Sequence, residues 1–105
     1  MAEVEVHFTE YFGGETVAVS SQGRELLRAE RLHTDMRTSL ARVARIELPP
    51  QRIEVTFEVV SKDARAAIAI DPSELKFVVV SLKGDQLRLE AVTVSDYKRE
   101  PRGYA

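Results

Sequence analysis

Alternation of apolar and polar side chains is clearest between residues 53 and 60, which read IEVTFEVV. Every second position is apolar, so in an extended chain these side chains share one face and the polar ones occupy the other. The apolar members are Ile53, Val55, Phe57 and Val59. This pattern predicts a half-buried β-strand, around which the remaining elements are arranged.

The same alternation, interrupted by turn-forming residues, predicts strands at 2–8, 15–20, 64–70, 75–82 and 86–94. Turns are expected at Gly13-Gly14, 21–23, Pro49-Pro50, 61–63 and 83–85. The middle of 75–82, LKFVVVSL, is apolar on both faces, which predicts a strand covered on two sides. Residues 71–74, DPSE, have the residue types of a capped helical turn.

The segment from 24 to 46 allows two interpretations. Leu26, Ala29, Leu32, Met36, Leu40 and Val43 recur every three or four residues, which is typical of an amphipathic helix. The polar cluster His33-Thr34-Asp35 with Thr38-Ser39 falls midway, where such residues favour turns. We therefore favour two strands, 25–32 and 41–48, around a structured loop at 33–40, with a helix as the alternative.

Seven or eight short strands without βαβ alternation predict an all-β fold, a small antiparallel β-sandwich of immunoglobulin-like or prealbumin-like type. The cysteine pair and tryptophan of immunoglobulin domains are absent. If 24–46 is helical, the fold becomes α+β, with one amphipathic helix packed on an antiparallel sheet. We expect a single domain at 1–95, followed by a polar C-terminal tail at 96–105.

The chain has 105 residues, no cysteine and a net charge of −2. Disulfides, thiolate metal sites and cysteine nucleophiles are therefore excluded. The first ten residues carry acids where a secretory signal carries bases, and no apolar run is long enough to span a membrane. We expect a soluble cytoplasmic protein with no membrane attachment.

Charge is distributed unevenly along the chain. Residues 24–45 contain six arginines and three acids, whereas the first fifteen residues contain four glutamates and no Lys or Arg. Clustered arginines suit recognition of phosphates or carboxylates, because the guanidinium donates two hydrogen bonds at once. Alternatively, the acidic first strand lies beside the basic segment and the charges pair across the sheet. The candidate binding residues are Arg28, Arg31, His33, Arg37 and Arg42.

No catalytic motif, phosphate-binding loop or calcium loop occurs, so we predict no catalytic residues, no cofactor and no metal site. His7 is expected to be solvated on the first strand. The leading hypothesis is a non-catalytic domain that binds a protein partner or itself. A polyanion-binding module using the arginines of 24–45 is the alternative, and a small hydrolase or lyase using His33 and Asp35 comes last.

Overall fold

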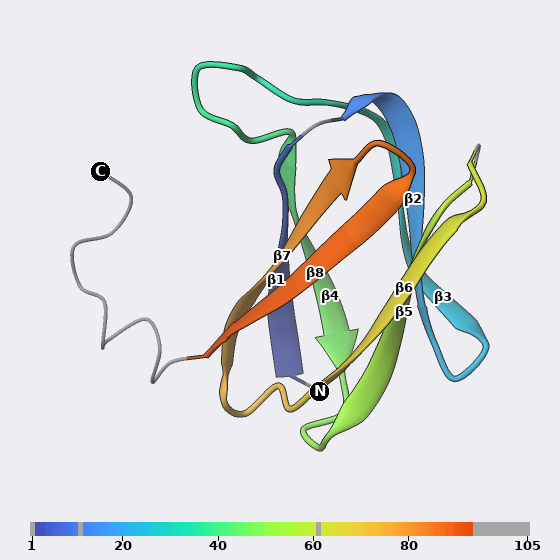
Figure 1. The fold of residues 1–105 in the computed structure, drawn as a ribbon. Coiled ribbons are helices and arrows are strands. Elements are labelled where there is room, and N and C mark those ends of the chain that lie inside the picture. Colours follow the sequence, from blue (N-terminus) through green and yellow to red (C-terminus); the bar gives the residue numbers. More distant parts are fainter. Residues whose placement is uncertain (1, 11, 61, 94–105) are drawn as a thin grey trace.

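A computed structural model describes residues 2–10, 12–60 and 62–93, and within these ranges the chain forms eight strands and no helix (Figure 1). The strands are β1 (Ala2–Phe8), β2 (Gly13–Ser21), β3 (Arg24–His33), β4 (Arg42–Leu48), β5 (Ile53–Val59), β6 (Ala64–Ile70), β7 (Leu75–Lys83) and β8 (Gln86–Thr93).

The strands form two four-stranded sheets that pack face to face (Figure 1). One sheet has the order β4-β1-β7-β8 and the other β3-β2-β5-β6. Neighbouring strands are antiparallel except β1 and β7, which run parallel. The predicted β-sandwich is confirmed, and the alternative of a helix over 24–46 is wrong.

The strand order does not confirm the immunoglobulin-like type. In an immunoglobulin constant domain the first, second, fifth and fourth strands form one sheet, and the third, sixth and seventh form the other. Here the first and second strands lie in different sheets. The prealbumin-like type and the domain boundary at residue 95 stay predictions, and the predicted tail at 96–105 lies outside the described residues.

The core lies between the sheets and is built from alternate residues of each strand. On β5, Ile53, Val55, Phe57 and Val59 are all buried, and β5 pairs with β6 without a break in register. The facing sheet contributes every second residue of its own strands: Val4, Val6 and Phe8 of β1, Ala44, Ile46 and Leu48 of β4, and Val78, Val80 and Leu82 of β7. Burial of these apolar side chains is the main stabilising contribution.

Strand β3 is irregular, and its irregularity explains one step of the helix-like spacing, from Ala29 to Leu32. Val17 of β2 pairs with Ala29, but Glu15 pairs with Leu32, so β3 has one extra residue between these pairs. This is a β-bulge, in which Arg31 adopts a left-handed φ of 53°. Because of the bulge, Ala29 and Leu32 both face the core although they are three residues apart.

Two of the predicted turns differ in detail from expectation. Gln22 and Gly23, with φ values of 52° and 75°, form the two-residue connection typical of a β-hairpin between β2 and β3. Asp71–Glu74 is a single reverse turn and not the start of a helix. The Glu74 amide donates to the Asp71 carbonyl at 3.0 Å, and the Ser73 amide donates to the Asp71 carboxylate. The described residues contain no helix long and apolar enough to cross a membrane.

Candidate functional site

The predicted binding residues separate in the structure. Four of them lie at one end of the sandwich, on or beside the loop that joins β3 to β4, whereas Arg28 lies midway along β3. The group of four comprises Arg31, His33, Arg37 and Arg42. Figure 1 shows this loop, residues 34–41, extending beyond the ends of the strands. We name it the β3–β4 loop.

The β3–β4 loop has a defined backbone conformation. Asp35 and Leu40 form a bridge that closes the loop, and Asp35 N–H donates to the Leu40 carbonyl at 3.1 Å. The Asp35 carbonyl accepts from Thr38 and Ser39, and Ser39 has a left-handed φ of 56°. The Asp35 carboxylate accepts from the Arg37 amide at 2.9 Å, which is the side-chain-to-backbone bond of an Asx turn. The prediction that the polar cluster midway through 24–46 forms a turn is therefore confirmed.

Thr34 fixes the base of the loop to the body of the sandwich. Its hydroxyl donates to the Thr9 carbonyl and accepts from the Phe12 amide at 2.9 Å, while its own amide donates to the Phe12 carbonyl. On the other side of the loop, the Ala41 amide donates to the Phe8 carbonyl at 2.7 Å. One end of the loop is thus tied to the segment between β1 and β2, and the other to the last residue of β1.

The tip of the loop presents two long side chains to solvent. Met36 is 77% exposed and the Arg37 side chain is 92% exposed. Arg37 Nε lies 3.6 Å from the Asp35 carboxylate, an exposed ion pair of little energetic weight. The tip therefore combines a flexible apolar side chain with a cation on a backbone that is already held in place.

Beside the loop, the bulge and a glycine pair position two further predicted residues. Arg31 is exposed at the bulge. His33 pairs with Gly13 at the end of β3, and its ring lies against Gly14, where a Cβ atom would come within 3.5 Å of Cε1. Gly14 also has a φ of 106°, which side chains rarely adopt. Any larger residue at position 14 would be strained by this φ, while its Cβ would make only ordinary van der Waals contact with His33.

Glu15 and Lys62 form an ion pair at the same end of the molecule. Partial burial raises the pKa of Glu15, but hydrogen bonds from the Gly13 and Glu15 amides, together with Lys62, outweigh burial and hold that pKa below its ordinary value. The Lys62 ammonium lies 3.3 Å from Glu15 and 3.8 Å from Asp85. The ends of β2, β5 and β7 are thereby linked by charge close to the β3–β4 loop.

Arg28 does not join this end of the molecule. It projects from β3 and donates to both oxygens of Glu25, at 2.8 Å and 3.4 Å. The hydrogen bond to Glu25, and the nearby charges of Glu30 and Glu58, raise the pKa of its guanidinium above its ordinary value. Arg28 is thus surrounded by carboxylates of its own chain.

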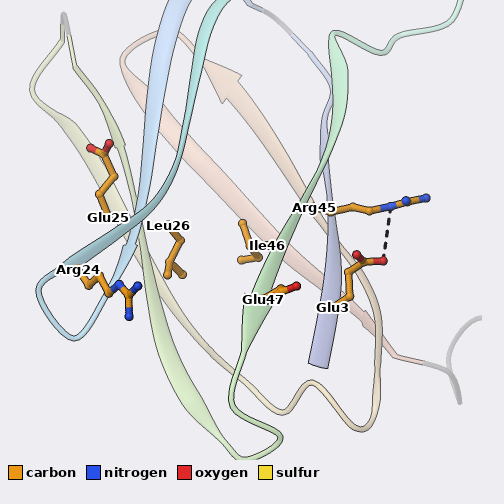
Figure 2. A pocket seen from close by; sticks show the side chains of 7 residues that line it. All are labelled: Glu3, Arg24, Glu25, Leu26, Arg45, Ile46 and Glu47. Carbon is orange, nitrogen blue, oxygen red and sulfur yellow. Dashed lines mark ion pairs between the residues drawn. The ribbon is translucent and has the colours of Figure 1, made fainter. Parts of the chain in front are cut away.

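Arg45, which belongs to the same basic segment, pairs with the acidic first strand. It lies opposite Glu5 in the β1–β4 ladder, and its guanidinium is 3.7 Å from Glu5 and 3.8 Å from Glu3. Figure 2 shows the pair with Glu3 on the outer side of β4. Cross-strand pairing, one of the two interpretations of the uneven charge, therefore accounts for this arginine.

A groove of about 430 Å³ lies between the edges of β3 and β4, toward the end of the molecule opposite the loop. Leu26 and Ile46 lie between the two strands in Figure 2, and the rest of the lining is charged. It comprises Glu3, Arg24, Glu25, Arg45 and Glu47. None of the five predicted binding residues lines it.

His33 and Asp35, the pair of the least favoured hypothesis, form no interaction with each other in the described part of the chain. His33 lies against Gly14, while the Asp35 carboxylate is bound to the Arg37 amide. Within residues 2–10, 12–60 and 62–93, no three His, Asp or Glu side chains gather in a way that could hold a metal ion.

His7 is more covered than the sequence predicted. Its ring stacks on Phe77 of β7 with a centroid distance of 4.3 Å, and it lies 3.0 Å from the Glu5 carboxylate. Only 24% of its side chain is exposed. The apolar pattern of 75–82 predicted a strand covered on both sides, but the parallel pairing that brings His7 to Phe77 has no local signal.

Sequence reasoning missed two residues of the candidate site, Thr34 as its anchor and Met36 as its exposed tip. The bonding partners of Thr34 are 22 and 25 residues away in the chain, so no short pattern reveals them. Comparison with protein-family models, with curated proteins and with solved structures gave no match for this chain.

Proposed function

We propose that this protein is a non-catalytic domain that binds a protein partner through the β3–β4 loop. The observation that carries the proposal is Met36, a large apolar side chain 77% exposed at the tip of a loop whose backbone is held by hydrogen bonds at its base and within its turn. Loops held by a rigid β-scaffold are common binding elements.

The chemistry of the tip suits a protein surface. Methionine adapts its shape to irregular apolar pockets, and Arg37 beside it can form charge-assisted hydrogen bonds with a carboxylate. Because the loop is already ordered, binding loses less conformational entropy than it would with a flexible loop. The partner we expect therefore offers an apolar pocket with an acidic rim.

The placement of the arginines of 24–45 favours a protein over a polyanion. Arg28 and Arg45 lie away from the β3–β4 loop and are paired with glutamates, and Arg37 at the loop lies beside Asp35. Within the described residues, this leaves Arg31 and Arg42 as the arginines near the loop without an ion pair. A polyanion would require several unpaired cations on one continuous surface. We place the domain in the cytoplasm, an assignment supported by the absence of cysteine.

The test is photo-crosslinking in source cells, with a photoreactive amino acid at position 36 and, as control, at Gln22 in the exposed β2–β3 turn. We expect a discrete protein adduct from position 36 that is absent from position 22 and weakened by Arg37→Glu. Identical adducts from both positions, or no adduct from position 36, would overturn the proposal. An adduct removed by nuclease would instead identify a nucleic acid.

A further inference from the structure

The free edge of β8 is a candidate interface, because β8 ends its sheet and pairs only with β7 within the described chain. From Gln86 to Val92 its residues follow β7 without interruption, and the register shift falls beyond Val92. This segment contains no proline. Two of the devices that prevent an edge strand from pairing with another chain, a bulge and a proline, are therefore missing from this segment.

The charges on β8 are complementary to themselves. Arg88 and Glu90 point to the outer face on either side of Leu89, and neither forms an ion pair with another described residue. If a second β8 lies antiparallel with the two-fold axis at Leu89, Arg88 of each copy lies opposite Glu90 of the other. Directly opposed side chains have Cβ atoms roughly 5 Å apart, within reach of an ion pair.

Other registers are less favourable. An axis at Arg88 or at Glu90 would place two like charges directly opposite each other, and a shift by one residue would turn the core face outward. Only the axis at Leu89 opposes unlike charges while keeping both core faces on the same side. In that register all residues from Gln86 to Val92 pair.

Apolar side chains at this edge are incompletely buried. Leu87, Leu89 and Ala91 face the core opposite Leu82, Val80 and Val78, but unlike those residues they are only half-buried. Strand β6 lies beside β8 at this corner of the sandwich, and its half-buried Ala66 and Ile68 leave the edge apolar. A neighbouring strand would cover Leu87, Leu89 and Ala91.

The opposite edge of the same sheet has the same charge pattern but lacks these properties. On β4, Arg45 and Glu47 flank Ile46, yet Arg45 already pairs with Glu3 and Glu5. The core-facing residues of β4 are buried, and Pro49 follows the strand, so pairing across Ile46 would end at Leu48. Substitutions at the β8 edge can therefore be compared with matched substitutions at the β4 edge, which serve as the control.

We propose that a second copy of this chain pairs with the β8 edge, antiparallel and with its two-fold axis at Leu89, to form a continuous eight-stranded sheet. The partner strand is a second copy of β8, because in this register Arg88 and Glu90 of one copy lie opposite Glu90 and Arg88 of the other. This inference does not rest on the β3–β4 loop, which is a separate surface.

Sedimentation equilibrium of the full chain tests the proposal, from about 1 μM to about 1 mM, the range of weak association. We expect the mass to rise from 11.8 kDa toward twice that value with concentration. Arg88→Glu alone and Glu90→Arg alone each replace two attractive pairs by two repulsive ones, and should weaken association roughly tenfold or more. An equimolar mixture of the two variants restores opposite charges and should associate again.

Glu47→Arg makes the same chemical change on the opposite edge and should leave association unchanged. A mass of 11.8 kDa at every concentration of the wild type would overturn the proposal. So would a dimer that both single variants retain, or one that Glu47→Arg disrupts. Crosslinking from position 36 is read separately, so failure of the dimer and failure of the proposed function are distinguishable.

Discussion

Strands β5 and β3 belong to the same sheet but differ in almost every local property. In β5 strict alternation buries every second residue, and pairing with β6 has one register throughout. In β3 the register with β2 shifts, Arg31 is in the left-handed region and the buried residues Ala29 and Leu32 are three apart. Strand β5 is paired on both sides, whereas β3 lies at an edge and leads into the exposed loop.

An edge position permits irregularity but does not impose it, because the edge strands β4 and β6 pair with β1 and β5 without a register shift. The paired, doubly supported strand carries stability, and the edge strand can bend because only one neighbour constrains it. The bend in β3 brings Arg31 and His33 to the end where Met36 is exposed. We therefore expect substitutions in β5 to act on folding, and those in β3 and its loop to act on the shape of the candidate site.

The largest effect is expected from Phe57→Ala in β5. Phe57 is fully buried in the core, and truncating such a side chain leaves a cavity that costs about 3–5 kcal/mol. Chemical denaturation measures the loss. Val60→Ala, at the exposed end of the same region, serves as control and should change stability by less than about 0.5 kcal/mol. Similar losses from both would contradict the role assigned to β5.

Removing the hydroxyl that anchors the loop should have the next largest effect. Thr34→Val keeps the shape of the side chain but leaves the Phe12 amide and the Thr9 carbonyl without their partner, which should cost about 1–3 kcal/mol. Amide hydrogen exchange in the loop should also become faster. The same substitution at Thr38, exposed at the tip, is the control, and equal effects at 34 and 38 would remove Thr34 as the anchor.

Acid should weaken the interactions of the Glu15 carboxylate with Lys62 and the backbone amides. The folded state holds the pKa of Glu15 below its ordinary value of about 4.3, so its carboxylate stabilises the fold above that pH, and this contribution is lost as the pH falls through the lowered pKa. Glu15→Gln should therefore lower stability at pH 7, by up to about 1.5 kcal/mol, and flatten the loss between pH 5 and pH 2. Thermal unfolding of the wild type and of Glu15→Gln is measured across this pH range. Parallel curves of stability against pH for the two proteins would contradict the prediction.

The bulge itself can be tested by a pair of glycine substitutions in β3. Arg31→Gly relieves the left-handed conformation and should raise the free energy of unfolding by about 0.5–1 kcal/mol. Arg28→Gly, in the same strand without a positive φ, should lower it by a similar amount. Urea titrations measure the change in the free energy of unfolding for both variants, and the two changes should have opposite signs. A lower free energy of unfolding in both variants would argue against strain at the bulge.

The smallest effect on stability is expected at the loop tip. Met36→Ser removes an exposed side chain that contributes little to the core, so the unfolding free energy should change by less than about 0.5 kcal/mol. In a pull-down from source cells, Met36→Ser should nevertheless fail to recover the partner that crosslinking identifies. A variant that keeps the partner would move the binding surface away from Met36.

Much of the fold follows from sequence patterns, because alternation is a local property. The strand at 53–60 was predicted almost to its ends, and the loop predicted at 33–40 is observed one residue later. The pairing of β1 with β7 was not predictable, since the pairing of Glu5 with Phe77 depends on how the whole chain packs. One step of the helix-like spacing, from Ala29 to Leu32, coincides with the bulge in β3, where an extra residue changes a period of two into a step of three.

The candidate site was located only in part. Its arginines marked the right segment, but Arg28 lies midway along β3 and the other predicted residues lie at or beyond the end of that strand, so distance along the strand separates Arg28 from the others. Thr34 and Met36 carry no pattern that distinguishes them from ordinary loop residues. The role of Thr34 depends on its hydrogen bonds with Phe12 and Thr9, which are distant in the chain. The role of Met36 depends on its exposure at the loop tip.

The parallel pairing of β1 with β7 has a consequence for biosynthesis. As the chain leaves the ribosome, β1 is complete first, yet one of its two neighbours in the sheet is the seventh strand to appear. Until β7 emerges, the apolar side chains Val4, Val6 and Phe8 wait with only β4 beside them in their sheet. Contacts so distant in the chain form slowly. The nascent protein is thus exposed to wrong partners, including other nascent copies, until β7 has left the ribosome.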